Sequence, residues 1–178
     1  MPAGKPPRDW PAELHRALKA HRVRQAGYVP DAGHTRLIEL CRADRSMVAL
    51  PLTTEEEGIG LAAGAWLGGE RAALLMQSSG VGNCVNMLTL ASSCGFPLLM
   101  LITMRGEAGE RNPWQIPMGR ATPKALRLAG VRTLRLERAG EARAKADAAA
   151  KLAFENLGAA ALLISQSLIG VKSFSEQK

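Results

Sequence analysis

The chain has 178 residues, of which 47% are hydrophobic and 22% are charged, a balance typical of one soluble globular domain. A net charge of +7 with basic residues spread along the chain and only 4% aromatics argues against nucleic-acid binding, and favours a solvated basic surface or a small anionic substrate. No secretory signal and no uncharged apolar run of membrane-spanning length is visible, so we expect a cytoplasmic protein that does not bind a membrane.

Six short apolar runs alternate with helical patterns along the chain. Trp10, Leu14 and Leu18 recur at a spacing of four in the first helical pattern, and residues 140–158 form an alanine-rich helical stretch. This alternation predicts an α/β fold, with a mainly parallel six-stranded sheet and helices on both faces. The fifth run alternates apolar and charged residues, which predicts an edge strand. The predicted strands are 26–30, 47–52, 72–77, 97–104, 131–137 and 159–165.

The chain shows no internal repeat, low-complexity block or interdomain linker. We expect a flexible N-terminal tail over residues 1–8, a single domain over 9–172 and a C-terminal tail over 173–178. The three cysteines lie far apart and form no Cys-x-x-Cys motif or Cys/His cluster, which predicts reduced thiols and no metal site in this chain. They are Cys41, Cys84 and Cys94.

Polar or glycine-rich segments follow each of the first four predicted strands. Ligands of open α/β sheets bind beyond the carboxyl ends of the strands, so these segments predict a site at one edge of the sheet. Arg105 and Arg120 are candidates for binding an anion there, although an ion pair with Glu107 explains Arg105 equally well. Asp31 suits a turn as well as a site, and His34 suits a loop or cap better than a ligand.

Three adjacent carboxylates, Glu55, Glu56 and Glu57, precede twelve residues without a charge. Glu57 and Thr54 are spaced as in a capping box, and the helix dipole favours acids in a first turn. Residues 58–69 are apolar or small on every helical face, which predicts a buried helix with a partly buried first turn. A carboxylate buried there needs a partner or becomes protonated, so the triplet is a functional candidate that helical periodicity cannot resolve.

The segment "SSGVGN" lacks both the lysine of a phosphate-binding loop and the third glycine of a dinucleotide fingerprint. Gly80 and Gly82 instead predict a close approach of the backbone to a flat ligand or to a neighbouring subunit. Asn83 and Asn86 are interpreted as helix caps or as ligand contacts, and the sequence leaves both possibilities open.

Taken together, "TTEEEGIGLAAGAWLGG", "LLMQSSGVGNCVNML" and "LLMLITMRGEAGERNPWQIPMGRATPKAL" resemble the pyrimidine-binding domain of thiamine diphosphate enzymes. The resemblance covers residues 9–170 and is most specific over 50–126. It is strongest to the alpha subunit of sulfopyruvate decarboxylase, with phosphonopyruvate decarboxylase next. The activating glutamate of this family lies nine residues before the glycine of an Ala-Ala-Gly stretch. Counting back from Gly64 identifies Glu55, and leaves Glu57 to the capping box and Glu56 as a helix-end charge.

The resemblance implies a role for Glu55 in hydrogen bonding the aminopyrimidine ring of thiamine diphosphate and favouring its imino tautomer, which removes the proton from the thiazolium carbon. It also implies that Gln77, Ser79, Gly80 and Gly82 bind this cofactor. The site would then hold a small anionic 2-oxo acid, with three candidate contacts, namely Asp31, Arg105 and Arg120.

The family binds the diphosphate and Mg²⁺ through a Gly-Asp-Gly motif in a separate domain, and this chain contains no such motif. The resemblance therefore implies a beta subunit that carries this half, and a two-subunit enzyme that converts sulfopyruvate to sulfoacetaldehyde and CO2. A phosphonopyruvate decarboxylase subunit and a non-catalytic interaction module are the alternatives. We also expect self-association, because an all-apolar helix leaves a large patch on a monomer. The paired histidines of many relatives are replaced by "NPWQIP" at 112–117.

Overall fold

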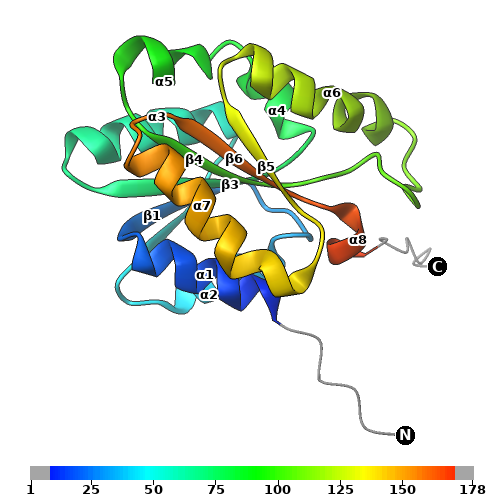
Figure 1. The fold of residues 1–178 in the computed structure, drawn as a ribbon, viewed down its shortest axis with the longest axis horizontal. Coiled ribbons are helices and arrows are strands. Elements are labelled where there is room, and N and C mark those ends of the chain that lie inside the picture. Colours follow the sequence, from blue (N-terminus) through cyan, green and yellow to red (C-terminus); the bar gives the residue numbers. More distant parts are fainter. Residues whose placement is uncertain (1–8, 171–178) are drawn as a thin grey trace, which may run out of the picture.

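The computed structural model describes residues 9–170 (Figure 1). Both predicted tails, 1–8 and 173–178, lie outside the described residues. Six strands form one sheet in the order β2-β1-β3-β4-β6-β5, and every neighbouring pair is parallel. The predicted six-stranded α/β fold is confirmed, and so is the edge position of β5. The strands are β1 Val23–Tyr28, β2 Val48–Pro51, β3 Arg71–Gln77, β4 Leu98–Thr103, β5 Arg132–Leu136 and β6 Ala159–Ile164.

Helices cover both faces of the sheet (Figure 1). One face carries α1, α2 and α7, and the other carries α3, α4, α5 and α6. Within residues 9–170, no helix is both long and apolar enough to cross a membrane. The helices are α1 Trp10–Ala20, α2 Thr35–Ala43, α3 Glu55–Leu67, α4 Gly80–Cys84, α5 Thr89–Cys94, α6 Gln115–Leu128, α7 Ala142–Phe154 and α8 Gln166–Ile169.

The strands β3, β4 and β6 are apolar along most of their length because they are buried on both faces. Successive side chains of a strand point to opposite faces, so Leu75 and Leu101 pack under α1 and α7, whereas Leu74 and Met100 pack under the helices of the other face. The sheet therefore separates two hydrophobic cores. This is the arrangement in which parallel strands appear as nearly continuous apolar runs.

Two helix ends use an uncommon backbone conformation. Arg22, after α1, has φ +58°, and Leu157, after α7, has φ +51°. The left-handed region that follows a helix is usually occupied by glycine, because a Cβ atom is disfavoured there. The other positive-φ residues in the described part of the chain are glycines.

The strand order creates a topological switch point between β1 and β3. The chain passes from β1 to β2 on one side and then crosses to β3 on the other side, so its direction of winding reverses between β1 and β3. Ligands of open α/β sheets bind at such a reversal, beyond the carboxyl ends of the strands. The segments that start α3 and α4 follow β2 and β3 at this edge.

Candidate active site

Glu55 is the first residue of α3 and is held at the carboxyl edge of the sheet. The preceding residue, Thr54, is extended, with φ −138° and ψ 160°, so the chain turns directly from β2 into the helix. Glu55 is only 8% exposed, whereas Glu56 is half-buried and Glu57 is exposed. The predicted partial burial of the first turn is confirmed, and it is greatest at Glu55.

Two contacts from α4 fix the carboxylate of Glu55. The Nδ2 atom of Asn83 donates a hydrogen bond to Oε2 at 2.8 Å. A Cβ atom placed on Gly80 would lie 2.3 Å from the carboxyl carbon, so only glycine allows the backbone this close. No hydrogen bond to Oε1 is present within residues 9–170. The carboxylate is thus oriented from one side and retains an oxygen for a ligand.

Asn83 is a site residue whose role the sequence left open between helix cap and ligand contact. In the structure its amide binds the Glu55 side chain instead. Gly80 and Asn83 lie three residues apart on α4 and therefore share a face of the helix. The spacing of Asn83 three residues after Gly80 was the signal that the sequence offered. It does not reveal the partner, Glu55 on α3, which lies far away in the sequence.

Cys84, also on α4, packs beside the same carboxylates. Burial raises the pKa of its thiol to about 12, and the negative charges of Glu55 and Glu56 act in the same direction. The thiol therefore stays protonated and is a packing group rather than a nucleophile. All three cysteines are free, and no cluster of metal-binding side chains occurs within the described part of the chain.

The capping box predicted for α3 is wrong in its pairing. The Thr54 side chain makes no capping hydrogen bond, and Glu57 Oε2 accepts from the N–H of Thr53 at 2.8 Å instead of from Thr54. Glu57 still holds the helix start, because it reaches back one residue further than in a capping box. Glu56 lies at the helix end as expected, but its Oε2 is buried without a hydrogen-bond partner among residues 9–170.

The loop after β3 is tied to its neighbours by short polar contacts. Gln77 Nε2 donates to Ser79 Oγ at 3.2 Å. Ser78 accepts from the N–H of Arg105 through Oγ at 3.0 Å and from Thr122 Oγ1 through its carbonyl at 3.0 Å. These bonds connect the loop to the end of β4 and to α6. The candidate cofactor residues therefore lie on a fixed segment next to Glu55.

Arg105 forms a buried ion pair with Glu110, and not with Glu107, the partner that the sequence offered as an alternative. Its Nε and Nη2 atoms each donate to the Glu110 carboxylate at 2.6 Å, and Arg105 is only 6% exposed. The alternative pairing with Glu107 is wrong, because Glu107 binds Arg135. Hydrogen bonds from Arg105 hold the pKa of the Glu110 carboxyl at about 2. Glu110 also accepts from the N–H groups of Gly106 and Asn112 and from Gln166 Nε2.

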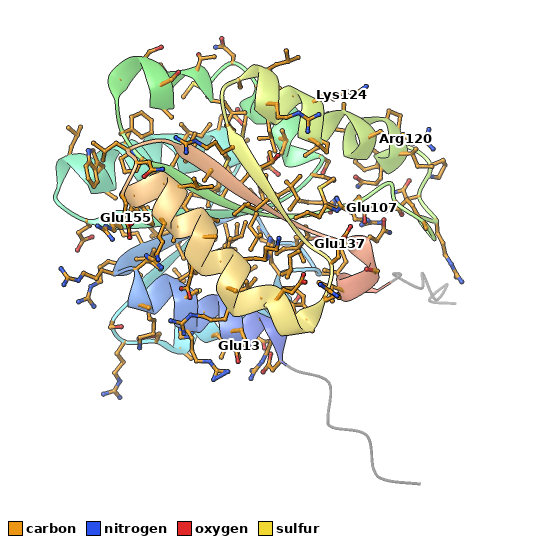
Figure 2. All side chains as sticks on the ribbon, in the orientation of Figure 1. Glu13, Glu107, Arg120, Lys124, Glu137 and Glu155 are labelled. Carbon is orange, nitrogen blue, oxygen red and sulfur yellow. The ribbon has the colours of Figure 1, made fainter. Side chains whose placement is uncertain are left out.

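Asp31 and Arg105 face one small cavity of about 40 Å³, little larger than the ~30 Å³ that a water molecule occupies in the liquid. Asp31 Oδ2 accepts from Thr103 Oγ1 at 2.7 Å and from the N–H of Gly33 at 3.1 Å, so it serves the turn as well as facing the cavity. The third candidate, Arg120, does not join them. Arg120 is exposed on the outer side of α6 near Lys124 (Figure 2).

His34 is more deeply buried than its sequence position suggested. It precedes α2 but makes no side-chain cap, and its Nε2 atom lies 3.2 Å from the Met76 carbonyl and 3.0 Å from the Leu101 carbonyl. Since carbonyls only accept, Nε2 carries the proton and donates to β3 and β4. Burial lowers the pKa of His34, which keeps the ring neutral. His34 therefore links the start of α2 to β3 and β4.

Comparison with known proteins identifies the family. No family model matches the chain. The chain is 40% identical to the sulfopyruvate decarboxylase subunit alpha of Methanocaldococcus jannaschii over 114 residues, which are 64% of this chain and 68% of that protein. The chain belongs to the family of sulfopyruvate decarboxylase alpha subunits. The strongest resemblance seen in its sequence is thereby confirmed.

Two further matches are to longer proteins. The phosphonopyruvate decarboxylase of Streptomyces viridochromogenes is 37% identical over 119 residues, or 66% of this chain and 30% of that protein. The fold matches a 2-oxoglutarate:ferredoxin oxidoreductase from Magnetococcus marinus with a TM-score of 0.71, over 90% of this chain and 29% of the other. With 13% sequence identity, the second match establishes a shared fold.

Proposed function

We propose that this chain is the pyrimidine-domain subunit of a two-subunit, thiamine diphosphate-dependent decarboxylase that converts sulfopyruvate to sulfoacetaldehyde and CO2. The observation that carries the proposal is the Glu55 carboxylate, buried at the reversal point of the sheet and oriented by Asn83 and Gly80. Membership of the sulfopyruvate decarboxylase alpha-subunit family supports the choice of substrate.

The residues around Glu55 suit an aminopyrimidine ring. Its Oε1 atom is the oxygen left for a ring nitrogen, while Gln77, Ser79, Gly80 and Gly82 would line the cofactor. When bound, thiamine diphosphate supplies a carbon nucleophile for the keto group and accepts the electrons released with CO2. Glu55 holds and exchanges a proton at Oε1, and its burial strengthens that coupling because little water competes for the proton.

Arg105 is the proposed contact for an anionic group of the substrate; Asp31 faces the same cavity, whereas Arg120 lies apart from it on α6. A guanidinium has five N–H donors in one plane, and the bond to Glu110 uses two of them. The remaining donors suit a sulfonate or carboxylate oxygen. The cavity shared by Asp31 and Arg105 is only about 40 Å³, so we expect it to widen when a substrate binds.

The outer face of α3 supports the proposal of a partner subunit. The inner face packs on the sheet through Gly58, Ile59, Ala62 and Ala65, but Leu67 on the outer side is 88% exposed. An apolar pocket of about 330 Å³ lies along this face, lined by Ile59, Gly60, Ala63, Trp66, Leu67, Leu90, Cys94 and Phe96. Soluble monomers rarely leave such a surface open. We infer that a beta subunit with the Gly-Asp-Gly motif and Mg²⁺, or a second copy, covers it in the assembly.

Phosphonopyruvate is the second candidate substrate, supported by the 37% identity to a phosphonopyruvate decarboxylase. It differs from sulfopyruvate only in the anionic group that the site must hold. Steady-state assays of the reconstituted enzyme with sulfopyruvate and with phosphonopyruvate distinguish the two candidate substrates. Absence of turnover with either acid, in an assembly that binds thiamine diphosphate, would favour a non-catalytic interaction module.

Cofactor binding tests the division of the site between two subunits. Since this chain has no Gly-Asp-Gly motif, the isolated chain should show little affinity for thiamine diphosphate with Mg²⁺, and the complex with its partner should bind both. Titration calorimetry on the chain, the partner and their mixture measures this. Tight, Mg²⁺-dependent binding to the isolated chain would contradict the two-subunit site.

Substitution of Arg105 tests its contact with the substrate. Arg105→Ala alone would leave the Glu110 carboxylate buried without its partner, so the informative variant is Arg105→Ala combined with Glu110→Ala. Losing a charged hydrogen bond of about 2 kcal/mol should raise KM for sulfopyruvate roughly 30-fold, and much less for pyruvate, which has no second charge.

The matched control for this experiment is Glu110→Ala, which removes the ion pair but retains Arg105. Its KM for sulfopyruvate should stay the same or fall, because the guanidinium no longer has to leave a carboxylate. An equal change in KM for both substrates in the double variant would show that Arg105 has a structural role only.

A further inference from the structure

Three arginines line one cavity at the opposite edge of the sheet from Glu55. Arg22 and Arg24 flank the first residue of β1, and Arg71 begins β3, where it pairs in register with Val23. They line a cavity of about 550 Å³. The rest of its lining is Trp66, Gly69 and Glu70. Seven residues of β3 separate this edge from the carboxyl edge, a distance of roughly 20 Å.

None of the three arginines has a carboxylate partner within residues 9–170, whereas six of the twelve other arginines described there do. Arg24 Nη1 donates to the Ser46 carbonyl and Arg71 Nη1 to the His21 carbonyl, each at 3.0 Å. The acid in the lining, Glu70, accepts from Gln25 at 2.6 Å. The cavity therefore carries an excess of positive charge. The ion-paired arginines are Arg16, Arg36, Arg105, Arg135, Arg138 and Arg143.

Two of these guanidinium groups are held in place before any ligand arrives. The carbonyl bonds fix Arg24 and Arg71, and the guanidinium carbon of Arg71 also lies 4.9 Å from the centre of the Phe154 ring. Each still has N–H donors that form no hydrogen bond within residues 9–170. Fixed donors lose little conformational entropy when they bind an anion.

Arg22 occupies a backbone position that would ordinarily favour glycine. Its φ of +58° disfavours any residue with a Cβ atom, and its side chain forms no hydrogen bond or ion pair within the described residues. Neither the backbone nor an intramolecular contact accounts for an arginine here. An arginine kept in a strained conformation at the mouth of a positively charged cavity points to a role for its side chain.

We propose that this cavity is a second binding site, which takes the phosphate groups of a small phosphorylated molecule. A multiply charged oxyanion can accept from several guanidinium groups at once, which a single chloride or carboxylate cannot do as well. Trp66 forms an aromatic wall on one side of the cavity. The site is separate from Glu55, so the proposal does not depend on the decarboxylase function.

Inorganic pyrophosphate is the probe, tested on the full chain by titration calorimetry and thermal unfolding. Sodium chloride at equal ionic strength serves as the reference. Pyrophosphate should bind with a measurable affinity and raise Tm, whereas chloride should not. Arg22→Gly should weaken pyrophosphate binding about tenfold or more, as expected for a lost charged hydrogen bond. The same variant should raise Tm of the free chain by roughly 3 °C, because glycine relieves the backbone strain.

Leu157→Gly is the matched control, because Leu157 is the other non-glycine residue with a positive φ in the described chain and does not line the cavity. It should stabilise the free chain similarly and bind pyrophosphate normally. Arg22→Asn, which also tolerates this backbone conformation, repeats the test if Arg22→Gly folds poorly.

Equal effects of pyrophosphate and chloride would overturn the proposal, as would unchanged pyrophosphate binding in both Arg22 variants. If those variants weaken assembly with a partner protein but still bind pyrophosphate normally, the arginines form a protein interface and the proposed site is wrong.

Discussion

Replacing Glu55 with glutamine should lower the decarboxylation rate of the reconstituted enzyme by ~100-fold or more, in the range of general acid–base contributions. Glutamine preserves the shape of the side chain and can still accept from Asn83, but it cannot exchange a proton with the cofactor ring. Binding of thiamine diphosphate should change less than turnover. Decarboxylation assays, with circular dichroism to confirm the fold, measure both effects.

The two neighbouring glutamates provide matched controls for this prediction. Glu57→Gln retains an oxygen that can accept from the N–H of Thr53, so it should cost only a few tenths of a kcal/mol in stability and almost nothing in rate. Glu56→Gln should leave the rate nearly unchanged. If either of these variants abolishes activity while Glu55→Gln does not, then the nine-residue count from Gly64 has identified the wrong carboxylate.

The second large effect is expected from Gly80→Ala, which adds a methyl group where the Glu55 carboxylate lies. The new Cβ would sit 2.3 Å from the carboxyl carbon, so the carboxylate must move and its bond with Asn83 must break or bend. Misplacing a catalytic group by about 1 Å can cost roughly 100-fold in rate. Because the obstructed group is the flexible end of a side chain, we expect the variant to fold, with a stability loss of about 1–3 kcal/mol.

Gly158→Ala is the control for the added methyl group. Its Cβ would meet the Leu152 carbonyl oxygen at 3.4 Å, which is an ordinary contact, and Gly158 precedes β6 at the amino edge of the sheet. Both rate and thermal stability should stay close to those of the unsubstituted chain. A folded Gly80→Ala enzyme with full turnover would show that the contact with α4 does not set the orientation of Glu55.

The sheet could be predicted from the sequence because burial on both faces leaves a simple signature. Nearly all side chains of β3, β4 and β6 are apolar, and the charged alternation of β5 marks an edge. The partial burial of the first turn of α3 was also predictable, since an uncharged stretch follows it. Choosing Glu55 from the triplet needed the spacing of a known family, because all three glutamates continue onto apolar rows.

The remaining features depend on contacts that no local pattern specifies. The pairing of Arg105 with Glu110 rather than Glu107 is decided by how the loop folds back, since both acids lie within reach in sequence. At the start of α3, Glu57 accepts from the N–H of Thr53 rather than of Thr54, and the Thr54 side chain forms no capping hydrogen bond. The burial of His34 depends on carbonyls of β3 and β4 that lie far along the chain.

The open outer face of α3 links the abundance of this chain to that of its partner. A copy synthesised in excess presents the apolar outer side of α3 with Leu67 almost fully exposed, and surfaces of this kind promote aggregation and attract chaperones and proteases. In the proposed assembly, the partner covers that helix, so the apolar surface is no longer exposed. Unmatched copies would therefore be cleared, and the stoichiometry of the complex would be maintained by degradation as well as by balanced synthesis.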